Sequence, residues 1–157
     1  MESHMCAGSL AGGVAAGTFA DMVVSPGGAL LQGSIAGILS VFGYKYVTPW
    51  LTKRFGLMDT CGIHNLHGMP GLLGGLAGII ASTIATESKY GAPLDQVFPR
   101  GSKQAGYQVA AYFITLAIAM SSAVLCAYAV KWITRRAPSE EEQYDDKDGW
   151  EVPGPMA

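Results

Sequence analysis

A stretch of 27 residues, from Gln104 to Val130, contains no charged residue. A helix of about 20 mostly apolar residues is long enough to cross the hydrocarbon core of a bilayer. Three more apolar runs precede it, and only 14% of all residues are charged, against about 25% in an average soluble chain. The sequence therefore predicts an all-α polytopic membrane protein. Its four transmembrane helices are expected near residues 5–24, 27–51, 62–86 and 104–134.

The last part of the chain differs sharply in composition. Residues 139–157 contain seven acidic side chains and a single basic one, Lys147. A segment with so much net charge and so few large apolar residues cannot bury enough surface to fold. We expect residues 1–137 to form the transmembrane segment and residues 138–157 to be a disordered, acidic cytoplasmic tail. This tail, and the absence of a basic patch with interleaved aromatic residues, argue against a nucleic-acid partner.

The basic residues predict the orientation of the chain in the bilayer. With four spans, both termini lie on the same side. Seven of the ten Lys and Arg residues fall on that side: near the end of the second run, in the loop after it, and beyond the fourth run. Because loops rich in Lys and Arg stay in the cytoplasm, we expect a multi-pass cell-membrane protein with both termini cytoplasmic.

Glycines recur four residues apart in the first three runs, where small residues let helix backbones approach closely. This spacing predicts that these three helices pack tightly, whereas the fourth, with no glycine after Gly106, suits the lipid-facing periphery. Asp21, deep in the first run, would need a partner, so we expect the chain to be part of a larger bundle. The glycine pairs are Gly8–Gly12, Gly13–Gly17, Gly33–Gly37, Gly71–Gly75 and Gly74–Gly78.

Two histidines, His64 and His67, stand at the head of the third apolar run. Asp59 and Thr60 are good N-cap types for a helix that begins at about Cys61. Three interpretations are open for the histidines: a zinc half-site with Cys61, a pair of hydrogen-bonded interfacial side chains, or a substrate or proton pathway. Helical geometry disfavours zinc, because Cys61 and His67 diverge by about 120° around the axis.

No sequence pattern of an enzyme competes with these interpretations. The chain lacks a G-x-S-x-G turn, a Walker A loop and paired carboxylates at a helix mouth. We therefore expect neither an enzyme nor a bound cofactor or metal ion.

The segment DTCGIHNLHGMPG, residues 59–71, closely resembles the signature of the Rh glycoproteins within the ammonium transporter superfamily. Residues 10–18 and 28–33 match as well, and the tail segment WEVP at 150–153 is similar to the epithelial, non-erythroid members. The resemblance implies a bundle of eleven or twelve helices, of which this chain would supply the last four. It also implies trimers, in which each protomer has its own narrow hydrophobic pore for ammonia.

The resemblance assigns roles to four residues. His67 matches one of two histidines that face each other at the pore centre, and its partner is expected on an earlier helix outside this chain. Ile63 and His64 match positions that line the pore below His67, and Asp59 matches an acid of the cytoplasmic vestibule. Ala7 stands where the family often has an asparagine.

The function implied is transport of ammonium as neutral ammonia, by a homotrimer or in association with other Rh subunits in the lipid bilayer. The alternative is a truncated, non-conducting membrane protein that co-assembles with full-length Rh subunits or regulates them.

Overall fold

The structure is a computed structural model that describes residues 2–22, 25–91 and 94–135. Every regular element in this described part is a helix, which confirms the all-α fold class. The predicted tail, 138–157, lies outside the described residues. Contacts divide the chain into two units, residues 1–113 and 114–157, which are described separately. The long helices are α1 (Glu2–Gly17), α2 (Pro26–Phe42), α3 (Thr48–Phe55), α4 (Met69–Thr83) and α7 (Gln104–Thr134).

Two π-helical segments interrupt the α-helical geometry. The first, η1 (Gly43–Val47), joins α2 to α3 in one helical run from Pro26 to Phe55, and the second, η2 (His64–Gly68), leads into α4. In both cases the second residue after the segment is a proline, Pro49 or Pro70. A proline inside a helix clashes with the carbonyl four residues earlier. The wider turn before each proline relieves that clash and lets the helix continue.

The first helix is shorter than its apolar run. It ends at Gly17, not near residue 24, and the chain then turns, with Phe19 N donating to Ala16 O (3.3 Å) and Met22 N to Phe19 O (3.0 Å). The turn buries the Phe19 side chain, which is 5% exposed. Asp21 lies in this turn and is exposed, so the interpretation of Asp21 as an acid deep within a helix is wrong.

The other helices depart from the expected ranges at their ends. The helix expected over 27–51 continues to Phe55, where Gly56 adopts a left-handed conformation (φ 67°) and stops it. The helix expected over 62–86 extends from Ile63 to Thr83. The helix expected over 104–134 is α7. The loop before α7 contains the short helices α5 (Glu87–Tyr90) and α6 (Leu94–Val97) and the 3₁₀ turn η3 (Gly101–Lys103).

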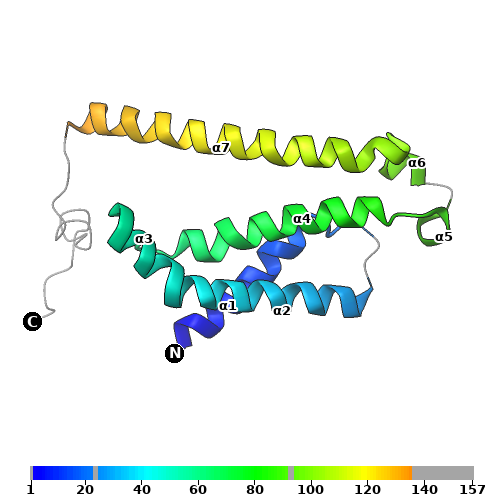
Figure 1. Cartoon of the computed structure of the whole chain (residues 1–157), viewed down its shortest axis with the longest axis horizontal. Helices are drawn as coiled ribbons and strands as arrows, with labels where there is room; N and C mark the ends of the chain where they lie inside the picture. Colours follow the sequence, from blue (N-terminus) through cyan, green and yellow to red (C-terminus); the bar gives the residue numbers. More distant parts are fainter. Residues whose placement is uncertain (1, 23–24, 92–93, 136–157) are drawn as a thin grey trace, which may run out of the picture. The chain divides into compact units, whose positions relative to one another are not determined.

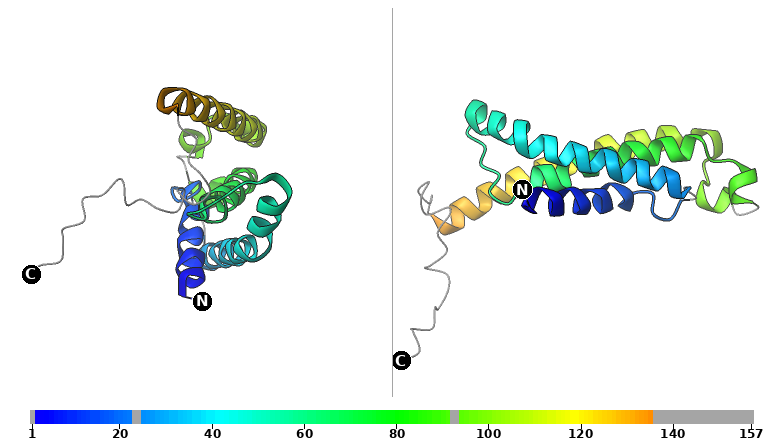
Figure 2. Two further views of the ribbon diagram at one scale, coloured as in Figure 1. Left: turned by 90° about the vertical axis from the view of Figure 1, so that its left-hand side faces the viewer. Right: turned by 90° about the horizontal axis from the view of Figure 1, so that it is seen from below.

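Helices α1, α2 and α4 pack together in the first unit, and α1 crosses the other two (Figures 1 and 2). A Cβ added to Gly12 would lie 3.4 Å from Gly33 Cα, and one on Gly37 would lie 3.3 Å from Gly8 O. Where α1 meets α4, a Cβ on Gly74 would lie 2.5 Å from the backbone oxygen of Ala15. The predicted close packing is therefore confirmed at these positions.

Not every predicted glycine is a packing position. A Cβ added to Gly13, Gly17 or Gly71 would meet nothing within 4 Å. Gly75 instead faces the Tyr112 ring. The four-residue spacing marks the glycine-rich helices correctly but does not say which glycine meets a neighbour.

Two described helical stretches are long and apolar enough to cross a membrane: Pro26–Phe55 and Gly101–Thr134. The apolar helix Cys6–Gly17 is shorter. The helical run Ile63–Thr83, which contains α4, is not among the two. The number of four spans stays a prediction. In the second unit, α7 by itself exposes bulky apolar side chains along its length, including Ile118, Leu125 and Trp132.

Candidate functional site

Asp59 holds the start of the helix that carries the histidines. Its Oδ1 accepts from Ile63 N (2.8 Å) and its Oδ2 accepts from His64 N (2.9 Å). These backbone N–H groups have no partner within the helix, and the carboxylate also complements the positive end of the helix dipole. The helix begins two residues later than the sequence indicates, because Gly62 adopts a left-handed conformation (φ 68°) just before it. The capping role predicted for Asp59 is nevertheless found.

The predicted pore residues share an open side of the helix. Ile63, His64 and His67 are all exposed in this chain, whereas Asn65 and Pro70 are buried. No described residue forms a hydrogen bond with the His67 side chain. The structure thus brings Asp59, Ile63 and His64 together at the start of the helix and places His67 three residues further along it.

The π segment η2 determines how the histidines face. Buried positions on the helix are four residues apart from Pro70 through Gly74, Gly78 and Ser82, but the preceding buried position, Asn65, is five residues before Pro70. In an uninterrupted α-helix, Leu66 would occupy the buried stripe, and His67 would follow it directly. The additional residue places His67 two positions after the buried one, further around the helix from the packed side.

Sequence reasoning missed Asn65, whose side chain is fully buried. Its Nδ2 donates to Thr48 Oγ1 (2.6 Å), and its Oδ1 lies 3.4 Å from His64 Nδ1. A Cβ on Gly43 would overlap the Asn65 amide, so the glycine of one π segment makes room for the asparagine of the other. The available signal was that Asn65 is the chain's only asparagine, within a segment otherwise poor in polar residues.

Metal binding finds no support in the described part of the chain. No group of three or more His, Cys, Asp or Glu side chains there could hold a metal ion. Cys61 is an exposed free thiol. The zinc alternative at Cys61, His64 and His67 therefore lacks a cluster of ligands.

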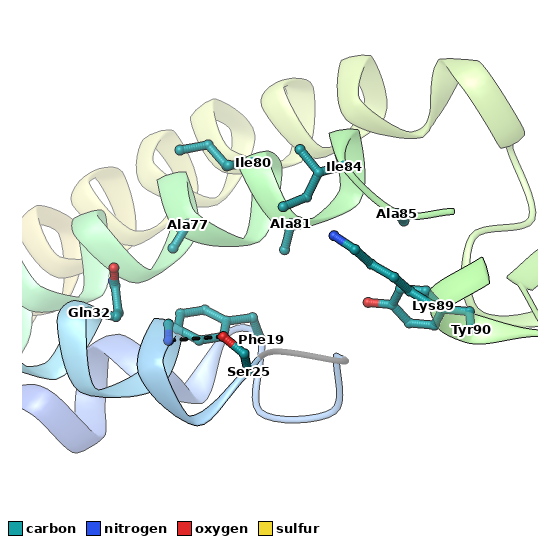
Figure 3. Close-up of a pocket in the computed structure, with 11 residues that line it drawn as sticks. Phe19, Ser25, Gln32, Ala77, Ile80, Ala81, Ile84, Ala85, Lys89 and Tyr90 are labelled. Atoms are coloured by element: carbon teal, nitrogen blue, oxygen red, sulfur yellow. Dashed lines mark hydrogen bonds between the residues drawn. The ribbon is translucent and has the colours of Figure 1, made fainter. Parts of the chain in front are cut away.

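A pocket of about 550 Å³ lies at the other end of α4 from the histidines (Figure 3). Its walls are mainly apolar, with Phe19, Ile80 and Ile84 among them, and Figure 3 shows Lys89 extending toward it. Gln32 Nε2 is buried here without a hydrogen-bond partner among the described residues. Ser25 Oγ caps α2 beside the pocket by accepting from Gly28 N (3.1 Å).

Comparison with known proteins identifies the relatives of this chain. The model of the Ammonium Transporter Family matches residues 2–151. The chain is 44% identical to the ammonium transporter Rh type B of Xenopus tropicalis, over 96% of this chain and 34% of that protein. It is 43% identical to the Rh type B protein of Rattus norvegicus and 40% identical to that of Homo sapiens, again over 96% of this chain. The chain spans about a third of the length of these curated relatives.

Proposed function

Because this chain belongs to the ammonium transporter family, whose model matches residues 2–151, we propose that it forms one wall of a pore that passes neutral ammonia across a membrane. The family match over nearly the whole chain is the observation that carries the proposal. The type B relatives confirm the resemblance to Rh glycoproteins seen in residues 59–71.

The proposed path runs along the open side of the η2–α4 helix. Ile63 and His64 line its cytoplasmic part, and His67 stands at its centre. The exposure of these side chains supports this assignment, because helices outside this chain have access to them. A neutral imidazole can donate through one nitrogen and accept through the other, so it can contact a passing amine without adding a charge to the path.

An apolar path selects the neutral species. Removing water from a unit charge is far more costly than removing it from a small polar molecule. Ammonium would therefore release a proton before entry, and ammonia would cross alone. Asp59 belongs to the cytoplasmic mouth in this account, where its carboxylate fixes the start of the pore helix through its two backbone contacts.

The complete protein is proposed to lie in the cell membrane as a homotrimer, or in association with other Rh subunits, with both termini cytoplasmic. The second histidine of the pore pair comes from a helix outside this chain. Three faces of this chain would then contact neighbouring helices or lipid: the open side of the η2–α4 helix, the outer side of α2 and the apolar length of α7.

A non-conducting role, in which the chain co-assembles with full-length Rh subunits, is the second candidate. It is favoured by the exposure of His67, whose side chain no other helix of this chain covers in the described residues. The two candidates differ in what this chain does when expressed alone in cells that lack their own ammonium carriers.

We expect no growth on low ammonium from the chain alone, because one wall does not enclose a path. Co-expression with the N-terminal two thirds of a type B relative should restore growth if the chain contributes a pore wall. Growth with the chain alone would contradict the one-wall account. Assembly of the two parts without any growth would favour the non-conducting role.

A further inference from the structure

Asn65 is the largest side chain that is fully buried in the described part of the protein. A buried amide is costly unless its polar atoms find hydrogen-bond partners. Here both ends of the amide have one: Nδ2 donates to the Thr48 hydroxyl (2.6 Å), and Oδ1 lies 3.4 Å from Nδ1 of His64. Asn65 therefore connects the start of the helix with the histidines to the start of α3.

The contact with Asn65 favours one form of the His64 ring. An amide oxygen only accepts hydrogen bonds, so this contact is a hydrogen bond only when Nδ1 of His64 carries the proton. In the neutral ring Nε2 then has no proton and acts as an acceptor. No described residue forms a hydrogen bond with Nε2.

Gly68 lies beside the His64 ring. The ring lies over Gly68, where an added Cβ would be 3.6 Å from His64 Cδ2. Gly68 contributes no side chain that could compete for the same space. One edge of the imidazole is thus bonded to Asn65, a second packs over Gly68, and the Nε2 side is left open.

We propose that Asn65 is a positioning residue of the pore helix: it fixes His64 as the Nδ1–H tautomer, with Nε2 as an acceptor on the open side, and ties η2 to α3 through Thr48. The functional role of this acceptor rests on the proposed function, because an acceptor at this point suits the N–H groups of an entering amine. The tautomer itself can be measured whether or not the chain transports ammonia.

The test is nitrogen NMR of this chain in lipid nanodiscs, with ¹⁵N-labelled histidine, at an alkaline pH of about 8, well above the model-compound value for imidazole of roughly 6.5. The chain has three histidines, and loss of one set of signals in His64→Asn assigns the ring of interest. We expect a protonated Nδ1 and an unprotonated Nε2. An Nε2–H ring in the unaltered chain, as a reversed amide would give, overturns the proposal.

Two variants separate positioning from mere packing. Asn65→Asp keeps an acceptor oxygen and should keep the tautomer, whereas Asn65→Leu removes it and should give a mixture of the two forms. Ser82→Ala is the matched control, because Ser82 is another buried polar residue of this helix but bonds only locally, to Ile79 O (2.7 Å). It should leave the His64 signals unchanged.

If Asn65→Leu does not fold, Asn65→Ala takes its place, because it also removes the acceptor oxygen. A His64 tautomer that is the same in a folded Asn65→Leu variant overturns the role of Asn65, whatever the transport measurements give. Failure of a complete transporter to pass ammonia would instead contradict the proposed function and leave the tautomer result standing.

Discussion

A methyl group added to Gly74 should force α4 away from α1. The added Cβ would lie 2.5 Å from Ala15 O and 3.0 Å from Thr18 Oγ1. Ala15 O is a backbone atom and cannot rotate away, so the two helices must separate by about 0.9 Å to reach an ordinary contact distance of 3.4 Å. Overpacking of this kind typically costs about 1–3 kcal/mol. We expect this clash to lower the free energy of unfolding of the first unit by that amount, before the gain from replacing glycine by alanine in a helix is counted.

Gly71→Ala is the matched control, since Gly71 lies in the same helix and an added Cβ there meets nothing within 4 Å. Replacing glycine by alanine inside a helix is favourable by about 0.5–1 kcal/mol, and this gain is common to both variants. The difference between them therefore isolates the clash and should be about 1–3 kcal/mol. The assay is equilibrium unfolding of this chain by SDS in mixed micelles, followed by circular dichroism. A Gly74→Ala variant as stable as Gly71→Ala would refute the described contact between α1 and α4.

Two further predictions concern the helix cap and the orientation. Asp59→Ala should destabilise the start of the η2–α4 helix by about 1–2 kcal/mol, because a lost N-cap leaves backbone donors unpaired. Asp59→Asn should lose less stability, since it keeps one acceptor oxygen. Equal stability of the unaltered chain and both variants in the same SDS titration would contradict the capping role. A cysteine introduced at Gln143 should react with an impermeant reagent only after cells are opened, and labelling from outside intact cells would mean that the predicted orientation is wrong.

The sequence predicts most of the helices because charge is excluded from long stretches of it. The run from Gln104 to Val130 is the clearest case, and α7 includes all of it. The end of α1 could not be predicted from hydropathy alone. The apolar run continues past Gly17, and hydropathy does not distinguish a turn from a helix within it. The turn at Phe19 and the burial of its side chain, a tertiary contact, show where the chain leaves the helix.

The local geometry of the site follows from features that helix periodicity does not capture. Patterns based on 3.6 residues per turn assume an unbroken α-helix, whereas the η2 segment adds one residue before Pro70. That one residue decides that Asn65, and not Leu66, occupies the buried stripe, and it moves His67 further from the packed side. The motif predicts which residues belong to the site, and the cap by Asp59 follows from residue type. The contact of Asn65 with Thr48 joins residues 17 positions apart and needs the fold to become visible.

The most direct test of the pore assignment is ammonia flux through a complete transporter that carries this segment, measured by stopped-flow in vesicles. His67 is expected to be the indispensable histidine, because it lies deeper in the apolar run, where water cannot replace it, whereas water can substitute for His64 nearer the mouth. With surface assembly shown to be intact, His67→Ala should abolish or sharply reduce the flux, and His64→Asn should leave most of it. Equal losses at the two positions, or a larger loss at His64, would contradict the account.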